Sequence, residues 1–131
     1  MASQRDVRRI ALALEGVSES PDNFRFFVNG KQFVWLWRER VDPKKARVPN
    51  PKVVVVRTAN DIDKQVLLAM DKNAFFTEPH YDGYNAVLIR LPEIRVAMLR
   101  DVIRQGWSAA GTARSRSRKG PRRGPASRRA R

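Results

Sequence analysis

The chain of 131 residues contains no cysteine and one histidine, His80. The lack of cysteine excludes disulfide bonds, thiolate metal ligands and cysteine nucleophiles, and one histidine does not make a histidine-rich zinc site. No apolar run is long enough to cross a bilayer, and the N-terminus lacks the apolar segment of a signal peptide. No phosphate-binding glycine loop or nucleophile motif occurs. These absences predict a cytoplasmic protein without metal or cofactor.

Charge, by contrast, is abundant and unevenly distributed. The net charge is +14, from 27 basic and 13 acidic residues. Residues 114–131 hold nine of the basic residues and no acid, so 18 basic and 13 acidic residues leave +5 on positions 1–113. Alanine is the only apolar residue of this segment, so burial cannot offset the entropy of ordering it. We predict one domain over residues 1–110 and a disordered basic Arg/Ser/Gly tail over residues 111–131.

The chain opens with the pattern of an amphipathic helix. Ser3 and Asp6 suit a capping box at its start, and Gly16 suits its end. The buried side of this helix is predicted to carry Val7, Ile10, Ala11 and Leu14.

Three strands are predicted after this helix. The first two, residues 23–28 and 31–39, flank Asn29-Gly30, the dipeptide that best suits a type I′ turn. The β-branched run of residues 52–57 predicts the third.

The second half predicts a helix, two strands and a last helix. The first of these helices starts near Asn60, and its buried side is predicted to carry Ile62, Val66, Ala69 and Met70. Strands are predicted at residues 74–78 and 86–91, and the last helix at Pro92, which suits a first-turn position. The apolar arc of that helix is wide, which indicates packing against both the sheet and the first helix, or contact with a partner.

The order α-βββ-α-ββ-α predicts a two-layer α+β domain whose five-stranded antiparallel sheet is covered by helices on one face. Three segments precede a predicted helix that holds Trp107. They are ALALEGV at residues 11–17, NGKQFVWL at 29–36 and FFTEPHYDGYNAVLIRL at 75–91. This pattern resembles the MmcQ/YjbR family of small bacterial proteins over about residues 5–110. The resemblance implies the same fold, with a secretion-chaperone-like outline, and DNA binding; it implies nothing for residues 111–131.

Aromatic residues are predicted to line one side of the second strand. Phe33, Trp35 and Trp37 alternate there with Val34 and Leu36 on the other side. Either the aromatic side chains belong to the core, or they form an exposed stripe that stacks nucleobases or makes a dimer interface.

The connection over residues 38–52 is the first candidate site. Its prolines, Pro43, Pro49 and Pro51, are predicted to stiffen it and to keep it out of helix and ladder. Its basic residues are Arg38, Arg40, Lys44, Lys45, Arg47 and Lys52. A stiff basic hairpin suits contact with nucleic-acid phosphates, whereas the alternative is a solvated loop that protects a sheet edge.

The tail is the second candidate. We predict electrostatic attachment to phosphates by Arg114, Arg116, Arg118, Lys119, Arg122 and Arg123. The alternatives are a solubility appendage or binding to RNA or an acidic protein surface.

The turn over residues 77–84 groups residue types that serve in catalysis. Glu78, His80 and Asp82 supply acids and a base, so a general-base site is one interpretation. Alternation along a strand opposes their convergence, and Pro79 and Gly83 suit a structural turn whose tyrosines close the end of the sheet.

The sequence thus predicts a non-enzymatic nucleic-acid-binding protein, for DNA rather than RNA, without a membrane partner. The alternatives are a protein-interaction or chaperone-like module using the open sheet face, and a small-molecule or enzymatic site at the His80 turn. Base specificity and oligomeric state stay open.

Overall fold

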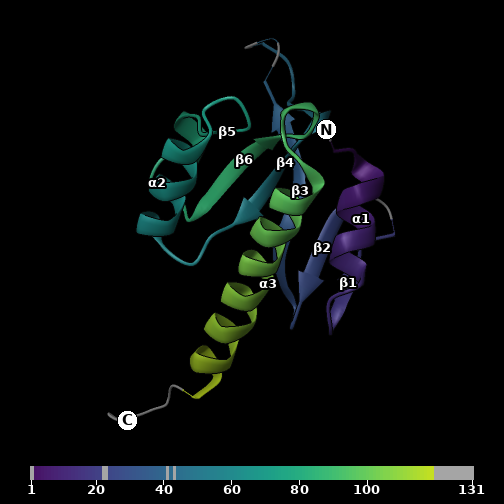
Figure 1. Cartoon of the computed structure of the whole chain (residues 1–131), viewed down its shortest axis with the longest axis vertical. Helices are drawn as coiled ribbons and strands as arrows, with labels where there is room; N and C mark the ends of the chain where they lie inside the picture. The colour runs from purple at the N-terminus through teal and green to yellow at the C-terminus, as the bar shows by residue number, and fades with distance from the viewer. Residues whose placement is uncertain (1, 22–23, 41, 43, 120–131) are drawn as a thin grey trace.

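The structure, a computed structural model, describes residues 2–21, 24–40, 42 and 44–119, with side chains as far as Gly111. The described part is α+β, and its elements follow one another as shown in Figure 1. The helices are α1 (Gln4–Leu12), α2 (Asp61–Met70) and α3 (Val96–Lys119), with 3₁₀ turns η1 (Pro79–Tyr81) and η2 (Leu91–Glu93). The strands are β1 (Val17–Glu19), β2 (Arg25–Val28), β3 (Lys31–Glu39), β4 (Val48–Arg57), β5 (Phe75–Phe76) and β6 (Ala86–Arg90).

The six described strands form one antiparallel sheet in the order β1-β2-β3-β4-β6-β5. The prediction of five strands was therefore wrong. It missed β1, in which Val17 pairs with Val28 and Glu19 with Phe26. This strand has three residues and no run of β-branched or aromatic side chains, so its place beside β2 defines it rather than its own sequence.

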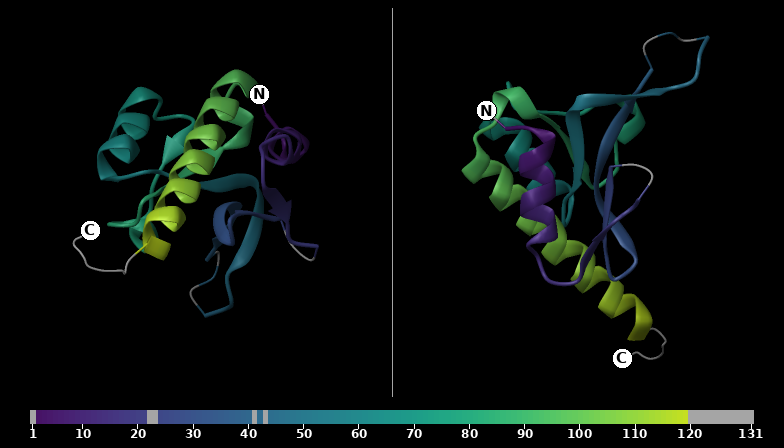
Figure 2. Two further views of the ribbon diagram at one scale, coloured as in Figure 1. Left: turned by 90° about the horizontal axis from the view of Figure 1, so that it is seen from below. Right: turned by 90° about the vertical axis from the view of Figure 1, so that its right-hand side faces the viewer.

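The helices cover one face of the sheet, as predicted (Figure 2). Between the two layers lies a core of fully buried side chains, among which are Phe26, Phe33, Val54, Ile89 and Ile103. Helix α3 contacts α1, β2, β3 and β4. Its wide apolar arc is therefore used inside the domain, by the sheet and the first helix together.

The first helix begins as predicted and ends early. Ser3 and Asp6 form the capping box, and the buried residues of the helix are Val7, Ile10 and Ala11. The helix ends at Leu12 rather than at Gly16, which has a φ of 77° in the following loop. This positive φ is the conformation that glycine adopts without strain.

A bulge in β3 overturns the predicted aromatic stripe. The turn before it is as expected, since Asn29 and Gly30 both have positive φ, of 52° and 78°. The register then shifts, because Phe26 pairs with Val34 but Phe27 pairs with Gln32. The extra residue is Phe33, which lies in the core under the helices. Trp35 and Trp37 lie in a separate cluster on the opposite face.

Helix α2 presents to the core a face other than the predicted one. Its buried residues are Lys64 and Leu67. Ile62, Val66 and Met70, predicted to be buried, are 73%, 52% and 54% exposed. The helix has apolar residues on two opposite faces, and periodicity alone did not decide which of the two meets the sheet.

The last helix begins at Val96, four residues after the predicted Pro92, which lies in η2. It passes close to β4 at Gly106, where an added Cβ would lie 2.7 Å from the backbone oxygen of Arg57. The helix continues through Gly111, the predicted boundary, to Lys119. The rest of the predicted tail, residues 120–131, lies outside the described residues.

Candidate nucleic-acid interface

The β3–β4 hairpin extends beyond the body of the domain (Figure 2, right). Backbone pairing continues outward to Arg38–Pro49 and Glu39–Val48. The prediction that the prolines keep this segment out of the ladder was therefore wrong for Pro49 and Pro51, which lie in β4. The register between β3 and β4 shifts at this point, and such irregular positions are where a strand tolerates proline.

Two of the predicted phosphate ligands hold the hairpin together. Nη1 of Arg47 donates to the backbone oxygen of Arg38 at 3.0 Å, and Nη1 of Arg40 donates to that of Lys45 at 2.9 Å. Arg47 is also half-buried. These arginines stiffen the hairpin, so their role is partly structural.

The remaining basic residues of the hairpin present their charges to solvent. Arg38, Lys44, Lys45 and Lys52 are exposed. Within the described part of the chain, the ion pairs join Arg8 to Glu19 and Arg9 to Asp6, so none involves these four side chains. Their charges are therefore available to an anionic partner.

A cavity of about 380 Å³ lies at the base of the hairpin, on the side of β2. The cavity is lined by Phe24, Arg25, Gln32, Trp35, Leu36, Arg38 and Pro49. None of these side chains is a carboxylate, so the charged groups in the lining are the two arginines. Sequence analysis missed Arg25 and Gln32 as site residues. The available signal was the alternation of β2, which places Arg25 on the face opposite to Phe24 and Phe26.

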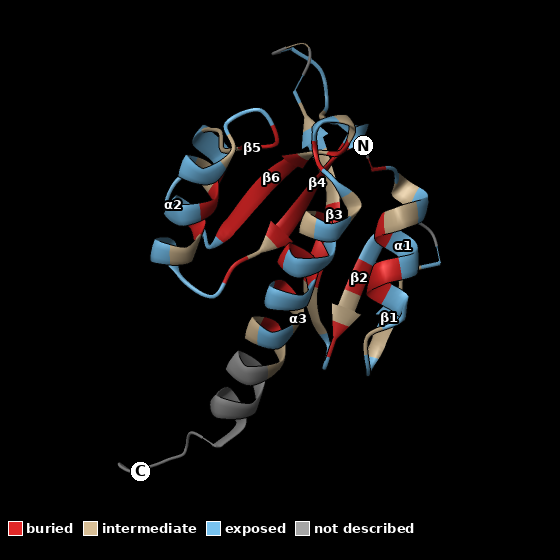
Figure 3. Ribbon diagram, in the orientation of Figure 1, coloured by how far each residue is buried: buried red, intermediate tan, exposed pale blue. Residues whose placement is uncertain are grey.

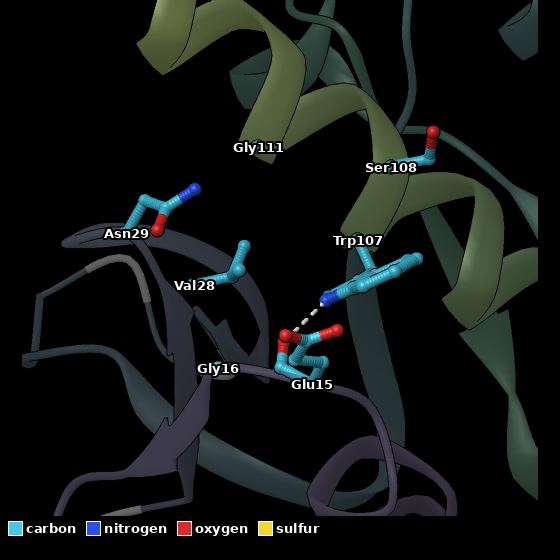
Figure 4. Close-up of a pocket in the computed structure, with 7 residues that line it drawn as sticks. All are labelled: Glu15, Gly16, Val28, Asn29, Trp107, Ser108 and Gly111. Carbon is cyan, nitrogen blue, oxygen red and sulfur yellow. Dashed lines mark hydrogen bonds between the residues drawn. The ribbon is translucent and has the colours of Figure 1, made fainter.

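Other cavities do not share this charge pattern. One of about 400 Å³ beside Trp37 is lined by Glu39 and Glu93 as well as Lys52 and Arg90. Another, of about 410 Å³ and shown in Figure 4, lies where α3 passes the loop between α1 and β1. There Nε1 of Trp107 donates to the backbone oxygen of Glu15 at 2.9 Å. Carboxylates in both cavities oppose an anionic ligand.

The aromatic residues of the open sheet face are packed rather than free. Trp35 and Tyr81 are each 8% exposed, and Nε1 of Trp35 donates to the Tyr81 hydroxyl at 3.2 Å. The guanidinium of Arg57 lies over the rings of Trp35 and Tyr84, and that of Arg90 lies 4.0 Å from the Phe76 ring centre. Trp35 therefore does not form an open stacking platform, whereas Tyr84 beside it is 42% exposed.

The turn over residues 77–84 closes this cluster. The buried Lys64 reaches it from α2, and its Nζ donates to the backbone oxygens of Tyr81 at 2.7 Å and Tyr84 at 2.8 Å. Burial raises the pKa of the Tyr81 phenol, and this outweighs the lowering by the hydrogen bond from Trp35. The tyrosines thus close this part of the sheet, as the structural interpretation of the turn expected.

His80 is exposed and lies at the edge of this turn. Its ring meets that of Tyr81 edge-on at 5.0 Å. The cavity beside it, about 270 Å³, is lined by Gln32, Trp35, Tyr81 and Tyr84. Among the described residues, neither Glu78 nor Asp82 lines that cavity or hydrogen-bonds to His80. The structure does not bring together the groups that a general-base site would need.

The basic hairpin and the end of α3, from which the predicted tail continues, lie at opposite ends of the described structure (Figure 1). The 24 residues of α3 span about 36 Å at 1.5 Å per residue, and the helix leads away from the hairpin. Arg114, Arg116, Arg118 and Lys119 fall in its last turns, where side chains are not described, and Arg122 and Arg123 lie outside the described residues. The hairpin and the end of α3, where the described part of the predicted tail stops, are therefore far apart.

The described residues contain no group of three His, Asp or Glu side chains arranged to hold a metal ion. Among the described helices, none has the length and apolarity that crossing a membrane requires.

Comparison with known proteins gives relatives in mycobacteria. No family model and no solved structure matches the chain. Uncharacterized proteins Rv2570 of Mycobacterium tuberculosis and Mb2600 of Mycobacterium bovis are each 35% identical to it over 114 residues. The aligned region covers 82% of this chain and 87% of each relative. The chain thus belongs to the same family as these mycobacterial proteins.

Proposed function

We propose that this protein is a non-enzymatic DNA-binding protein that contacts phosphates with its β3–β4 hairpin. The observation that carries the proposal is the carboxylate-free cavity at the hairpin base, which Arg25 and Arg38 line. Lys44 and Lys45 add exposed charge further out on the projecting hairpin, and the exposed Lys52 lies at its base beside the cavity that Glu39 and Glu93 also line. A phosphate backbone that follows the hairpin meets these cations in succession.

The physical basis is release of counterions from the DNA. Each lysine or arginine that neutralises a phosphate releases part of the condensed ion atmosphere, so affinity falls as salt rises. The hydrogen bonds from Arg40 and Arg47 hold the hairpin in shape before binding, which lowers the entropy lost in the complex. Guanidinium groups at the cavity suit bidentate contact with phosphate oxygens.

The tail is proposed as a second, separate phosphate contact. It starts from the end of α3 opposite the hairpin, so the two elements are expected to bind different stretches of one DNA molecule. Linking two contacts on one chain raises the apparent affinity through effective concentration. In this proposal the tail increases the affinity for DNA with little base selectivity, and the hairpin orients the domain on the DNA.

We also propose, on the resemblance described above, that the chain is related to the MmcQ/YjbR family and acts in the cytoplasm. The support is the sequence pattern over residues 75–110, in which a turn rich in aromatic residues leads through Leu91-Pro92 into the last helix. A solved structure of one of the mycobacterial relatives, compared with members of that family, tests this relation.

The test of the hairpin is a salt titration of duplex DNA binding, measured by fluorescence anisotropy. Changing Lys44, Lys45 and Lys52 to alanine in the full chain should reduce the slope of log affinity against log salt by about 2.7, at about 0.9 for each phosphate contact. The matched control changes three exposed residues on the helix side, Arg5, Arg100 and Arg104. This control should keep most of the slope of log affinity against log salt. Equal losses in both variants would show that the hairpin is not the interface.

Removing residues 120–131 tests the tail separately. This segment holds five arginines, so its loss should reduce the slope by up to about 4.5. The hairpin variant should lose the same 2.7 with or without the tail, because the two elements act at separate places. An unchanged slope after truncation would remove the tail from the interface.

A further inference from the structure

Helix α2 is exposed on the side that faces away from the sheet (Figure 3), and this side carries an apolar stripe. Ile62, Val66 and Met70 are 73%, 52% and 54% exposed, and Ala69 is exposed beside them. The spacing i, i+4, i+7, i+8 places all four on one side of the helix. Three of the six large hydrophobic residues that are exposed in the described part of the chain lie in this α2 stripe.

The domain does not need the α2 stripe for its own packing. Leu67 is buried on the opposite side of the helix and Leu68 packs against the core next to it. On this same inner side, the Nζ of Lys64 is hydrogen-bonded to the turn over residues 77–84. The stripe is therefore a contiguous apolar surface without an internal function, which is the kind of surface that marks a protein contact.

We propose that the α2 stripe binds a second copy of this chain, with the two α2 helices antiparallel. The stripe is nearly symmetric about Val66, because Ile62 and Met70 lie four residues before and after it. A two-fold axis through Val66 then places Ile62 of one copy against Met70 of the second. This is the isologous contact of a closed dimer, in which the same patch meets itself.

The charges beside the stripe select the antiparallel arrangement. Asp61 and Lys72 are exposed near its two ends. An antiparallel pair about Val66 places Asp61 of each copy opposite Asp71 and next to Lys72 of the other. Because the Asp71 carboxylate accepts hydrogen bonds from the backbone N–H groups of Asn73 and Ala74, the exposed charge nearest Asp61 is that of Lys72, which makes two attractive pairs. A parallel arrangement would place Asp61 beside Asp61 and Lys72 beside Lys72, which is repulsive. The helix dipoles also favour the antiparallel pair.

Helix α2 also lies in a part of this basic chain that carries little positive charge. Residues 60–73 contain three acids, Asp61, Asp63 and Asp71, and two lysines. One of the lysines, Lys64, is buried, whereas the chain as a whole carries +14. Two copies that meet through this helix therefore do not bring basic surfaces together.

The size of the surface indicates a weak dimer. Helix α2 has 10 residues and is about 15 Å long, so contact along one side of it buries less than the roughly 1,200 Å² of a standard interface. We expect dissociation on the order of 10⁻⁴ M, with self-association that is clearest when about 0.15 M salt or more screens the net charge.

The experiment measures self-association of the full chain by sedimentation velocity across a concentration series. Val66→Lys puts a charge at the centre of the proposed contact and should weaken dimerisation by at least about tenfold. The matched control is Leu12→Lys, which changes another exposed apolar residue, 43% exposed, on α1. It should leave the dimer unchanged. Circular dichroism melting confirms that both variants remain folded.

A charge-swap series tests the orientation. Asp61→Lys and Lys72→Asp should each weaken the dimer, because each places like charges together twice. The double variant should restore association, since both pairs become attractive again in reversed order. A double variant that stays as weak as the single variants would overturn the antiparallel arrangement.

Two results would overturn the second copy as the occupant of the stripe. One is a full chain that stays monomeric to about 1 mM at moderate salt, which would leave the stripe to a different macromolecule. The other is a dimer that Val66→Lys does not weaken, which would place the self-contact elsewhere on the surface.

Discussion

The two faces of the sheet are both packed, but by different kinds of interaction. On the helix side, Phe26, Phe33 and Ile103 are fully buried in an apolar core between two layers. On the open side, Trp35 is packed against Tyr81 of the turn over residues 77–84, which hydrogen bonds from Lys64 hold in place. The helix side is thus stabilised by apolar burial, and the open side by polar groups that tie a loop over aromatic rings.

This difference bears on function. A loop that covers the open face removes the simplest stacking surface for bases, and it also leaves little free apolar surface for a chaperone-like partner there. The exposed cations that we propose as phosphate contacts are on the hairpin and at its base, and the exposed apolar stripe is on α2. The α2 stripe therefore lies away from the open face, and the hairpin contact reaches that face at the cavity that Arg25, Arg38 and Trp35 line.

The largest effect is expected on the helix side. Phe33→Ala should destabilise the domain by about 3–5 kcal/mol, because it leaves a cavity in a rigid core. Phe27→Ala, on the same pair of strands but half-buried on the other side, should cost less than half as much. Urea unfolding followed by circular dichroism measures both, and equal losses would contradict the assignment of Phe33 to the core.

Lys64 tests how much the open side depends on polar contacts. Lys64→Met keeps most of the aliphatic stem but leaves the backbone oxygens of Tyr81 and Tyr84 without their donor, so we expect a loss of about 2–4 kcal/mol. Amide resonances of the turn should shift most. Lys72→Met, at an exposed position just after the same helix, should change the stability by no more than about 0.5 kcal/mol. Similar stabilities for the two variants would show that the lysine does not hold the turn.

Two glycines of α3 should respond with opposite signs. At Gly106 an added Cβ would lie 2.7 Å from the Arg57 backbone oxygen, so Gly106→Ala should destabilise by about 1–3 kcal/mol. At Gly111 the nearest atom is 3.5 Å away, and Gly111→Ala should stabilise the helix by up to about 1 kcal/mol. Thermal unfolding of the two variants gives the signs, and a stabilising Gly106→Ala would mean that α3 does not pass so close to β4.

Tyr81 gives the open side a pH dependence. Burial raises the pKa of its phenol in the folded state. The part of the free energy of unfolding that depends on the protonated phenol is therefore fully present below the ordinary pKa of about 10. It is then lost as the pH rises through the higher folded value. The free energy of unfolding, measured between about pH 9 and 11, should fall more steeply for the native chain than for Tyr81→Phe. Parallel curves would show that Tyr81 does not contribute to the pH dependence.

The smallest effect is expected at His80. Because its side chain is exposed, His80→Ala should change the stability by no more than about 0.5 kcal/mol. DNA affinity should stay within about twofold, because a single imidazole is a minor phosphate contact. A folded variant that loses turnover of a metabolite would instead restore the enzymatic interpretation of this turn.

Local patterns predicted the elements that depend on near neighbours. The capping box of Ser3 and Asp6 formed, the Asn29-Gly30 turn has two positive φ angles, and the three helices lie on one side of an antiparallel sheet. The connection between β3 and β4 was also found where the basic residues gather in the chain, although its strands pair further out than predicted. These features require only interactions over a few residues or a repeated apolar period.

Errors occurred where a distant segment decided the outcome. The bulge at Phe33 depends on the register with β2, and β1 exists because β2 offers it an edge. In α2 two apolar sides competed, and the side that fits the sheet brought Lys64 to the carbonyl oxygens of a turn 17 and 20 residues further along the chain. The cavity at the hairpin base likewise joins Arg25 of β2 to Arg38 of β3.

The sequence by itself determined the class of fold, the excess of positive charge and the position of the basic hairpin, because composition and periodicity act locally. Only the tertiary structure decided that the hairpin and the tail start lie at opposite ends, that Arg25 and Arg38 share a cavity, and that α2 turns Ile62, Val66 and Met70 outward. The physical reason is that such outcomes depend on the packing of distant segments, and a one-residue change of register or a rotation of a helix alters them without changing any local pattern.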